Sequence, residues 1–191
     1  LDWTQAPTTG WTEGEGWFTD GVMNTCHNAV DRHVLAGRGD QAAVIYESAA
    51  TGVTRTYSYA ELQDHVARTA GMLSGLGVAK GDRVVIYMPM IPETVFAMLA
   101  CARLGAVHSV VFGGFAAPEL AKRIDDATPK LLLMASCGIE GTKVVPYKPL
   151  VDHALELTAH QVSNVVVFQR EQAAAEMTAG RDLDWAEAMQ G

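Results

Sequence analysis

The sequence predicts an α/β fold with a largely parallel sheet, crossover helices, an N-terminal hairpin and an extended arm. From residue 83 to residue 168, short β-rich runs alternate with helical patterns, and strands alternating with helices pair in parallel through crossovers. These runs are apolar at almost every position, which is typical of a sheet covered on both faces. The composition agrees, because 49% hydrophobic and 19% charged residues is a globular balance.

The first 60 residues predict an arm, a helix and a hairpin. Residues 1–19 are rich in Trp, Thr and Gly without a consistent period, and we expect an extended arm that precedes an α/β portion over residues 20–191. Apolar residues at helical spacing predict a helix over 24–35. Two β-rich runs, 42–46 and 54–57, are joined by a turn and predict an antiparallel hairpin.

A capping box predicts the start of the next helix. Ser58 and Glu61 have the S-x-x-E spacing in which each side chain accepts a free backbone N–H of the other residue, and apolar residues follow on one face until Gly77. Strands and helices then alternate. The predicted strands are 83–88, 106–111, 130–135 and 164–168, and the predicted helices are 93–104, 118–127 and 150–159.

The remaining segments are predicted to be loops or short elements. We expect a tight loop at Gly113 and Gly114, a loop over 136–149 and a surface excursion over 169–180. Residues 183–186 are expected to open a short closing helix.

Charge and cysteine content disfavour several classes of function. With 22 acidic against 14 basic residues and no basic run, neither nucleic acid nor an anionic membrane is an expected partner. No apolar run approaches the ~20 residues that span a bilayer. The three cysteines are widely spaced, and no His/Cys cluster has metal-ligand spacing. We therefore predict no metal site and a cytoplasmic location.

Nucleotide-binding fingerprints are absent or out of order. Gly37 and Gly39 have G-x-G spacing, but the strand follows them instead of preceding them, which is the wrong order for a dinucleotide fold. No G-x-x-x-x-G-K-[ST] loop occurs. We predict no catalytic residue within this chain, and an unrelated reductase-like domain is a poor third hypothesis.

Two segments that follow predicted strands are candidate ligand sites. Residues 112–115, Phe-Gly-Gly-Phe, join a strand to a helix, so backbone N–H groups and the helix N-terminus could approach an anion. A tight turn without a ligand explains the same glycines equally well. Residues 138–143 combine glycines, a hydroxyl and a cation. Ligands of parallel sheets bind beyond the carboxyl ends of the strands, where both segments belong.

Six segments, in this order, resemble the N-terminal region of the short-chain, AMP-forming acyl-CoA synthetases, the acetyl- and propionyl-CoA synthetase group. They cover nearly the whole chain. The segments are 17–21, 28–33, 56–62, 80–84, 87–93 and 105–115. Residues 136–140 and 145–150 look more like propionyl-type members.

The resemblance implies part of the N-terminal domain of an adenylate-forming enzyme. Members of this family activate a short-chain carboxylate with ATP to an acyl-adenylate and transfer the acyl group to coenzyme A. The ATP and Mg²⁺ site and the mobile C-terminal domain lie beyond residue 191 in the family layout, so we expect no turnover from this chain alone. The family's contacts to coenzyme A map onto Phe112, Gly113, Gly114, Glu140, Gly141, Thr142 and Lys143.

This chain departs from acetyl-type members at the second of these segments. They carry two arginines, where this chain has Glu140 and Lys143. We expect the exchange to weaken the phosphate contact, because one point charge beside a carboxylate replaces a bidentate clamp.

The expected partners are the carboxylate, ATP, coenzyme A and the remainder of the same polypeptide. Exposed sheet surface also predicts self-association. The alternative hypothesis is a non-catalytic module of the same fold that binds coenzyme A or serves as a scaffold.

Overall fold

The computed structural model describes residues 21–190, and the arm predicted over residues 1–19 lies outside them. A helical segment and an antiparallel hairpin come first, as predicted, although part of the helix is wound as a π-helix. The helical segment comprises η1 (His27–Asp31) and α1 (Arg32–Leu35), and the hairpin comprises β1 (Ala42–Ser48) and β2 (Val53–Ser58).

A five-stranded sheet forms the centre of the fold, and every neighbouring pair in it is parallel. This confirms the predicted α/β class. In spatial order the strands are β4 (Val107–Phe112), β3 (Arg83–Met88), β5 (Leu131–Ala135), β8 (Asn164–Phe168) and β9 (Asp182–Asp184).

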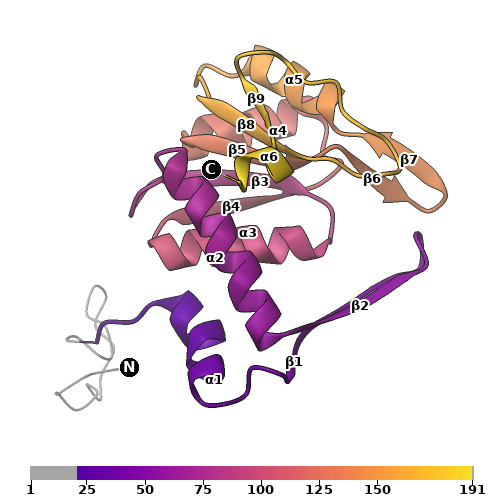
Figure 1. Cartoon of the computed structure of the whole chain (residues 1–191). Coiled ribbons are helices and arrows are strands. Elements are labelled where there is room, and N and C mark those ends of the chain that lie inside the picture. Colours follow the sequence, from indigo (N-terminus) through magenta and orange to yellow (C-terminus); the bar gives the residue numbers. More distant parts are fainter. Residues whose placement is uncertain (1–20, 191) are drawn as a thin grey trace, which may run out of the picture.

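Helices cover both faces of this sheet (Figure 1). Val84 and Ile86 of β3 pack with α2 and α3, whereas Val85 and Tyr87 pack with α4 and α5. Successive side chains of a strand point to opposite faces and so pack into two separate apolar clusters. Because both faces are buried, the strands are apolar throughout. The helices are α2 (Tyr59–Gly75), α3 (Pro92–Leu104), α4 (Ala117–Ala127), α5 (Lys148–Leu157) and α6 (Trp185–Ala188).

The predicted capping box is present at the start of α2. The Glu61 N–H donates to Ser58 Oγ at 3.2 Å, and the Ser58 N–H donates to Glu61 Oε2 at 2.8 Å. The backbone hydrogen bond from Ser58 holds the pKa of Glu61 below its usual range. The local prediction was correct here because the two residues satisfy each other without help from the rest of the fold.

One prediction of local structure was wrong, and another was correct only in part. Residues 136–149 do not form a loop, because β6 (Cys137–Glu140) and β7 (Lys143–Pro146) pair as a hairpin around a left-handed Gly141. The predicted closing helix is present as α6 (Trp185–Ala188), and the Asp184 side chain caps it by accepting the Ala186 and Glu187 N–H groups. The helix begins at residue 185, because residues 183 and 184 belong to β9, which pairs with β8. Elements of three or four residues are too short to show a period, and pairing with a neighbour decides their conformation.

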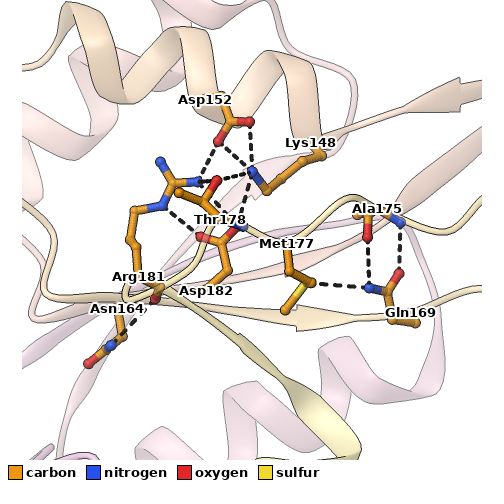
Figure 2. A network of polar contacts seen from close by, with 9 residues as sticks. All are labelled: Lys148, Asp152, Asn164, Gln169, Ala175, Met177, Thr178, Arg181 and Asp182. Atoms are coloured by element: carbon orange, nitrogen blue, oxygen red, sulfur yellow. Dashed lines mark hydrogen bonds and ion pairs between the residues drawn. The ribbon is translucent and has the colours of Figure 1, made fainter.

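A buried ionic network attaches β9 to α5 (Figure 2). The Asp182 side chain is fully buried, and its carboxylate lies 3.0 Å from Lys148 Nζ and 2.6 Å from Arg181 Nε. Asp152 of α5 accepts from Lys148 at 2.7 Å and also pairs with Arg181. The Thr178 N–H donates to Asp182 at 2.8 Å. Each buried charge in this network thus has an opposite charge and hydrogen bonds.

The network favours the ionised form of Asp182. Burial alone would raise the pKa of Asp182, but hydrogen bonds from Arg181, Thr178 and Lys148 hold it below the usual range. The network therefore contributes stability that is present above the pKa of an unfolded Asp, about 3.9, and is lost as the pH falls through the lower folded value.

We expect Asp182→Asn to lower the free energy of unfolding at pH 7 by about 3 kcal/mol, because it leaves the buried Lys148 and the half-buried Arg181 short of one partner. The measurement is urea denaturation followed by circular dichroism. Asp64→Asn is the control, since it removes an exposed carboxylate 2.9 Å from Arg68 and should cost no more than about 0.5 kcal/mol. The deficit should shrink below about pH 4, and an equal deficit at low pH would contradict the assignment.

Candidate functional site

The two predicted ligand segments lie at the carboxyl ends of the parallel strands. Phe112 is the last residue of β4 and is 67% exposed. Gly113 and Gly114 form the turn before α4, with the Phe115 N–H donating to the Phe112 carbonyl at 3.2 Å. β6 begins two residues after β5 ends. The position agrees with the rule for ligand sites in parallel sheets.

Close packing requires glycine at position 113, and the backbone angle favours glycine at position 114. A Cβ added at Gly113 would lie 2.7 Å from Tyr147 Oη and 2.9 Å from the Met88 carbonyl carbon. Gly114 has a φ of +101°, which other residues rarely adopt. The tight-turn explanation therefore accounts for the two glycines, and they do not by themselves indicate a ligand.

The structure brings the two predicted segments together. Glu140 Oε1 lies 2.8 Å from the position that a Cβ on Gly114 would occupy. Glu140 ends β6 and is paired with Lys143, the first residue of β7, across the turn formed by Gly141 and Thr142. Glu140, Lys143 and the two turn residues between them are all exposed. Lys143 is exposed and makes no ion pair with any residue in the 21–190 range.

A cleft of about 310 Å³ opens beside these segments. Phe112, Gly113 and Glu140 line it, whereas Gly114 and Lys143 do not. Its other walls come from the tip of the β1–β2 hairpin and from the turn between β3 and α3. The tips of both hairpins lie on the same side of the molecule in Figure 1. Residues of both hairpins line this cleft. The site thus combines apolar walls with a few polar groups, as ligand clefts commonly do.

Sequence reasoning missed three residues of the cleft region. Arg170 lines the cleft and donates through Nη1 to the Cys137 carbonyl at 2.9 Å. Its position just beyond β8 is the signal that could have found it, because the same strand-end rule applies. Tyr147 lines the cleft, and Tyr87 lies behind the turn. Tyr87 lies within an apolar strand and Tyr147 just before a helix, and neither position carries a local signal.

Tyr87 and Tyr147 are packed together beneath the turn. Their ring centroids are 5.0 Å apart. The Gly114 N–H donates to Tyr87 Oη at 3.1 Å, and Tyr87 Oη donates to the Phe115 carbonyl at 2.8 Å. Burial raises the pKa of Tyr87, and burial together with the neighbouring Tyr87 and Glu140 raises the pKa of Tyr147 to about 12. Both hydroxyl groups are therefore protonated at neutral pH.

No group of three or more His, Cys, Asp or Glu side chains in residues 21–190 is arranged to hold a metal ion. Within that range, none of the helices has the length and apolarity needed to cross a membrane. Cys26, Cys101 and Cys137 are all buried as free thiols.

Comparison with known proteins identifies the family. The family described as AMP-binding enzyme matches residues 31–189. The chain therefore belongs to the AMP-binding enzyme family.

Several relatives share sequence along most of this chain. It is 60% identical over 97% of its length to an uncharacterized protein of Pseudomonas aeruginosa, covering 30% of that protein. It is 49% identical over 90% of its length to the acetyl-coenzyme A synthetase of Pasteurella multocida, covering 26% of it, and 47% identical over 89% to the propionate–CoA ligase of Escherichia coli, covering 27%. The chain thus spans less than a third of these relatives. The likeness supports the short-chain acyl-CoA synthetase group but does not single out a propionyl type.

Substitution of either turn glycine should destabilise the chain. We expect Gly113→Ala to cost about 1–3 kcal/mol through overpacking against Tyr147 and Met88. Gly114→Ala should cost about 1–2 kcal/mol through its backbone angle. Gly71→Ala in α2 is the control, because its site is open and the change should stabilise the helix by up to about 1 kcal/mol. Urea denaturation measures all three, and a neutral Gly113→Ala would contradict the packing shown by the structure.

Proposed function

We propose that this chain is the coenzyme A-side portion of an AMP-forming acyl-CoA ligase. The whole protein would activate a short-chain carboxylate with ATP and transfer the acyl group to coenzyme A, with the ATP and Mg²⁺ site outside this chain. The observation that carries the proposal is the meeting of the Phe112–Gly114 turn with the Glu140–Lys143 hairpin at one cleft. Similarity to acetyl-coenzyme A synthetase and propionate–CoA ligase supports the reaction class.

The residues of this site suit the apolar and aromatic parts of coenzyme A better than its phosphates. The exposed Phe112 ring offers a stacking surface, and the cleft beside it has mainly apolar walls that suit an adenine or pantetheine group. Lys143 is a single point charge for a phosphate, and Glu140 opposes it from the neighbouring strand. We infer a coenzyme A contact that is weaker and more salt-sensitive than a pair of arginines would make.

Propionate is the acyl substrate that we favour, in preference to acetate. The proposal rests on the likeness of residues 136–140 and 145–150 to propionyl-type members. A cytoplasmic location also remains a prediction, based on the three free cysteines.

A non-catalytic module that binds coenzyme A or a protein partner is the second candidate function. The same cleft supports this candidate, because binding of a ligand or partner needs only the surface that the cleft provides. Continuation of the reading frame into a Gly-rich ATP loop would favour the ligase.

Titration of the chain with coenzyme A by calorimetry tests the site. We expect Lys143→Ala to weaken binding and Glu140→Gln to tighten it, each by about two- to fivefold, the range for an exposed charge interaction worth less than about 1 kcal/mol. Both effects should shrink at high salt. Lys80→Ala is the control, because Lys80 precedes β3 and therefore lies at the amino-terminal end of the strands, away from the cleft. Binding that responds equally to all three variants would contradict a phosphate contact at the hairpin.

Self-association is proposed to occur through β4. This strand pairs only with β3 among residues 21–190, and Val107 on it is 54% exposed. Open edge strands with apolar side chains invite pairing with another chain.

We expect light scattering to show oligomers that grow with concentration, and Val107→Lys to reduce them, because a charge on an edge strand opposes pairing. Leu157→Lys is the control, since Leu157 is 50% exposed but ends α5. A monomer at high concentration would refute the proposal.

A further inference from the structure

The hydroxyl group of Tyr87 holds the Phe112–Phe115 turn from the neighbouring strand. It accepts the Gly114 N–H at 3.1 Å and donates to the Phe115 carbonyl at 2.8 Å. One side chain thus binds a donor and an acceptor in two successive residues of the turn. The turn's own backbone contributes the Phe115 N–H bond to the Phe112 carbonyl at 3.2 Å. The conformation of the turn therefore depends on Tyr87 as well as on local geometry.

Burial alone does not account for a tyrosine at this position. The side chain is fully buried in the apolar cluster beneath α4 and α5, with Val85, Val111 and Leu120. A phenylalanine would fill the same space without bringing a polar atom into that cluster. Burying a hydroxyl is costly unless it is hydrogen-bonded, so the two bonds to the turn are what offset its presence.

Tyr147 connects the same turn to the β6–β7 hairpin. Its ring packs against Tyr87 at 5.0 Å between centroids. Its hydroxyl end fills the space beside Gly113, and a Cβ on Gly138 of β6 would overlap it. A shift of the turn would therefore press on the hairpin through this ring, since close-packed interiors transmit displacement.

We propose that Tyr87 is a positioning residue for the coenzyme A site, which fixes the turn through its hydroxyl and, through Tyr147, sets the turn and the hairpin in one arrangement. The inference rests on the proposed function, because it assumes that coenzyme A contacts both segments. Tyr87 itself lies beneath the turn and is not proposed to touch the ligand. Preorganisation of the turn would lower the cost of ordering it on binding.

The test compares Tyr87→Phe with Tyr57→Phe in the full chain. Tyr57 is a second buried tyrosine, packed against Phe96 in the cluster on the opposite face. The first readout is the hydrogen-exchange rate of the Gly114 amide by NMR, and the second is coenzyme A affinity by calorimetry. We expect Tyr87→Phe to speed Gly114 exchange by roughly five- to tenfold, because the hydrogen bond of that amide is lost. Coenzyme A binding should weaken by about three- to tenfold, because the turn loses both of its hydrogen bonds to the Tyr87 hydroxyl. Tyr57→Phe should change neither.

The two readouts separate failure of this inference from failure of the proposed function. Unchanged Gly114 exchange in Tyr87→Phe would overturn the inference, whatever the affinity. Faster exchange with unchanged affinity would also overturn it, because the turn would then be ordered without serving the ligand. A wild-type chain that gives no heat with coenzyme A would overturn both the proposed function and the positioning role. Faster exchange, weaker binding and a silent Tyr57→Phe would support it.

Discussion

Burial of the parallel sheet on both faces is the constraint on which the rest of this structure depends. β3 and β5 lie inside the sheet, and five of the six residues of β3 and all five of β5 are buried. Odd and even positions enter different clusters, so helices must cover both sides. Because crossover connections keep these strands parallel, the carboxyl ends of β3, β4, β5 and β8 all lie at the same end of the sheet.

At these carboxyl ends, candidate ligand-binding groups from segments distant in sequence lie close together. The turn after β4, the hairpin after β5 and Arg170 after β8 converge there on one cleft. Their convergence follows from strand direction, but their fine arrangement depends on side chains beneath them. Tyr147 requires glycine at Gly113 and Gly138, and Tyr87 binds the backbone of Gly114. The glycines of the candidate site are therefore explained first by packing, and a ligand would use a surface that packing has already shaped.

A buried ionic network holds β9, the edge strand at the opposite end of the strand order from β4. β9 is only three residues long and carries little apolar surface of its own. Asp182 on this strand is held by Lys148 and Arg181, so the strand is attached to α5 by charge as well as by its pairing with β8. A buried ion pair of this kind costs desolvation, and its complete hydrogen bonding is what makes it tolerable. Its role here is to specify where a short strand lies.

The sequence by itself determined the elements whose signals are local. The capping box of Ser58 and Glu61, the apolar strands and the strand–helix alternation specify α2 and the parallel sheet, because each signal lies within one turn of helix or one strand. The resemblance in six segments pointed to an adenylate-forming enzyme, and the match to the AMP-binding enzyme family over residues 31–189 confirms that broader assignment. Tertiary structure alone decided the β6–β7 hairpin, strand β9 and the Tyr87–Tyr147 pair. Short strands take their conformation from the strand with which they pair. The Tyr87 hydroxyl acquires its role only when folding brings the backbone of the turn after β4 within hydrogen-bonding distance.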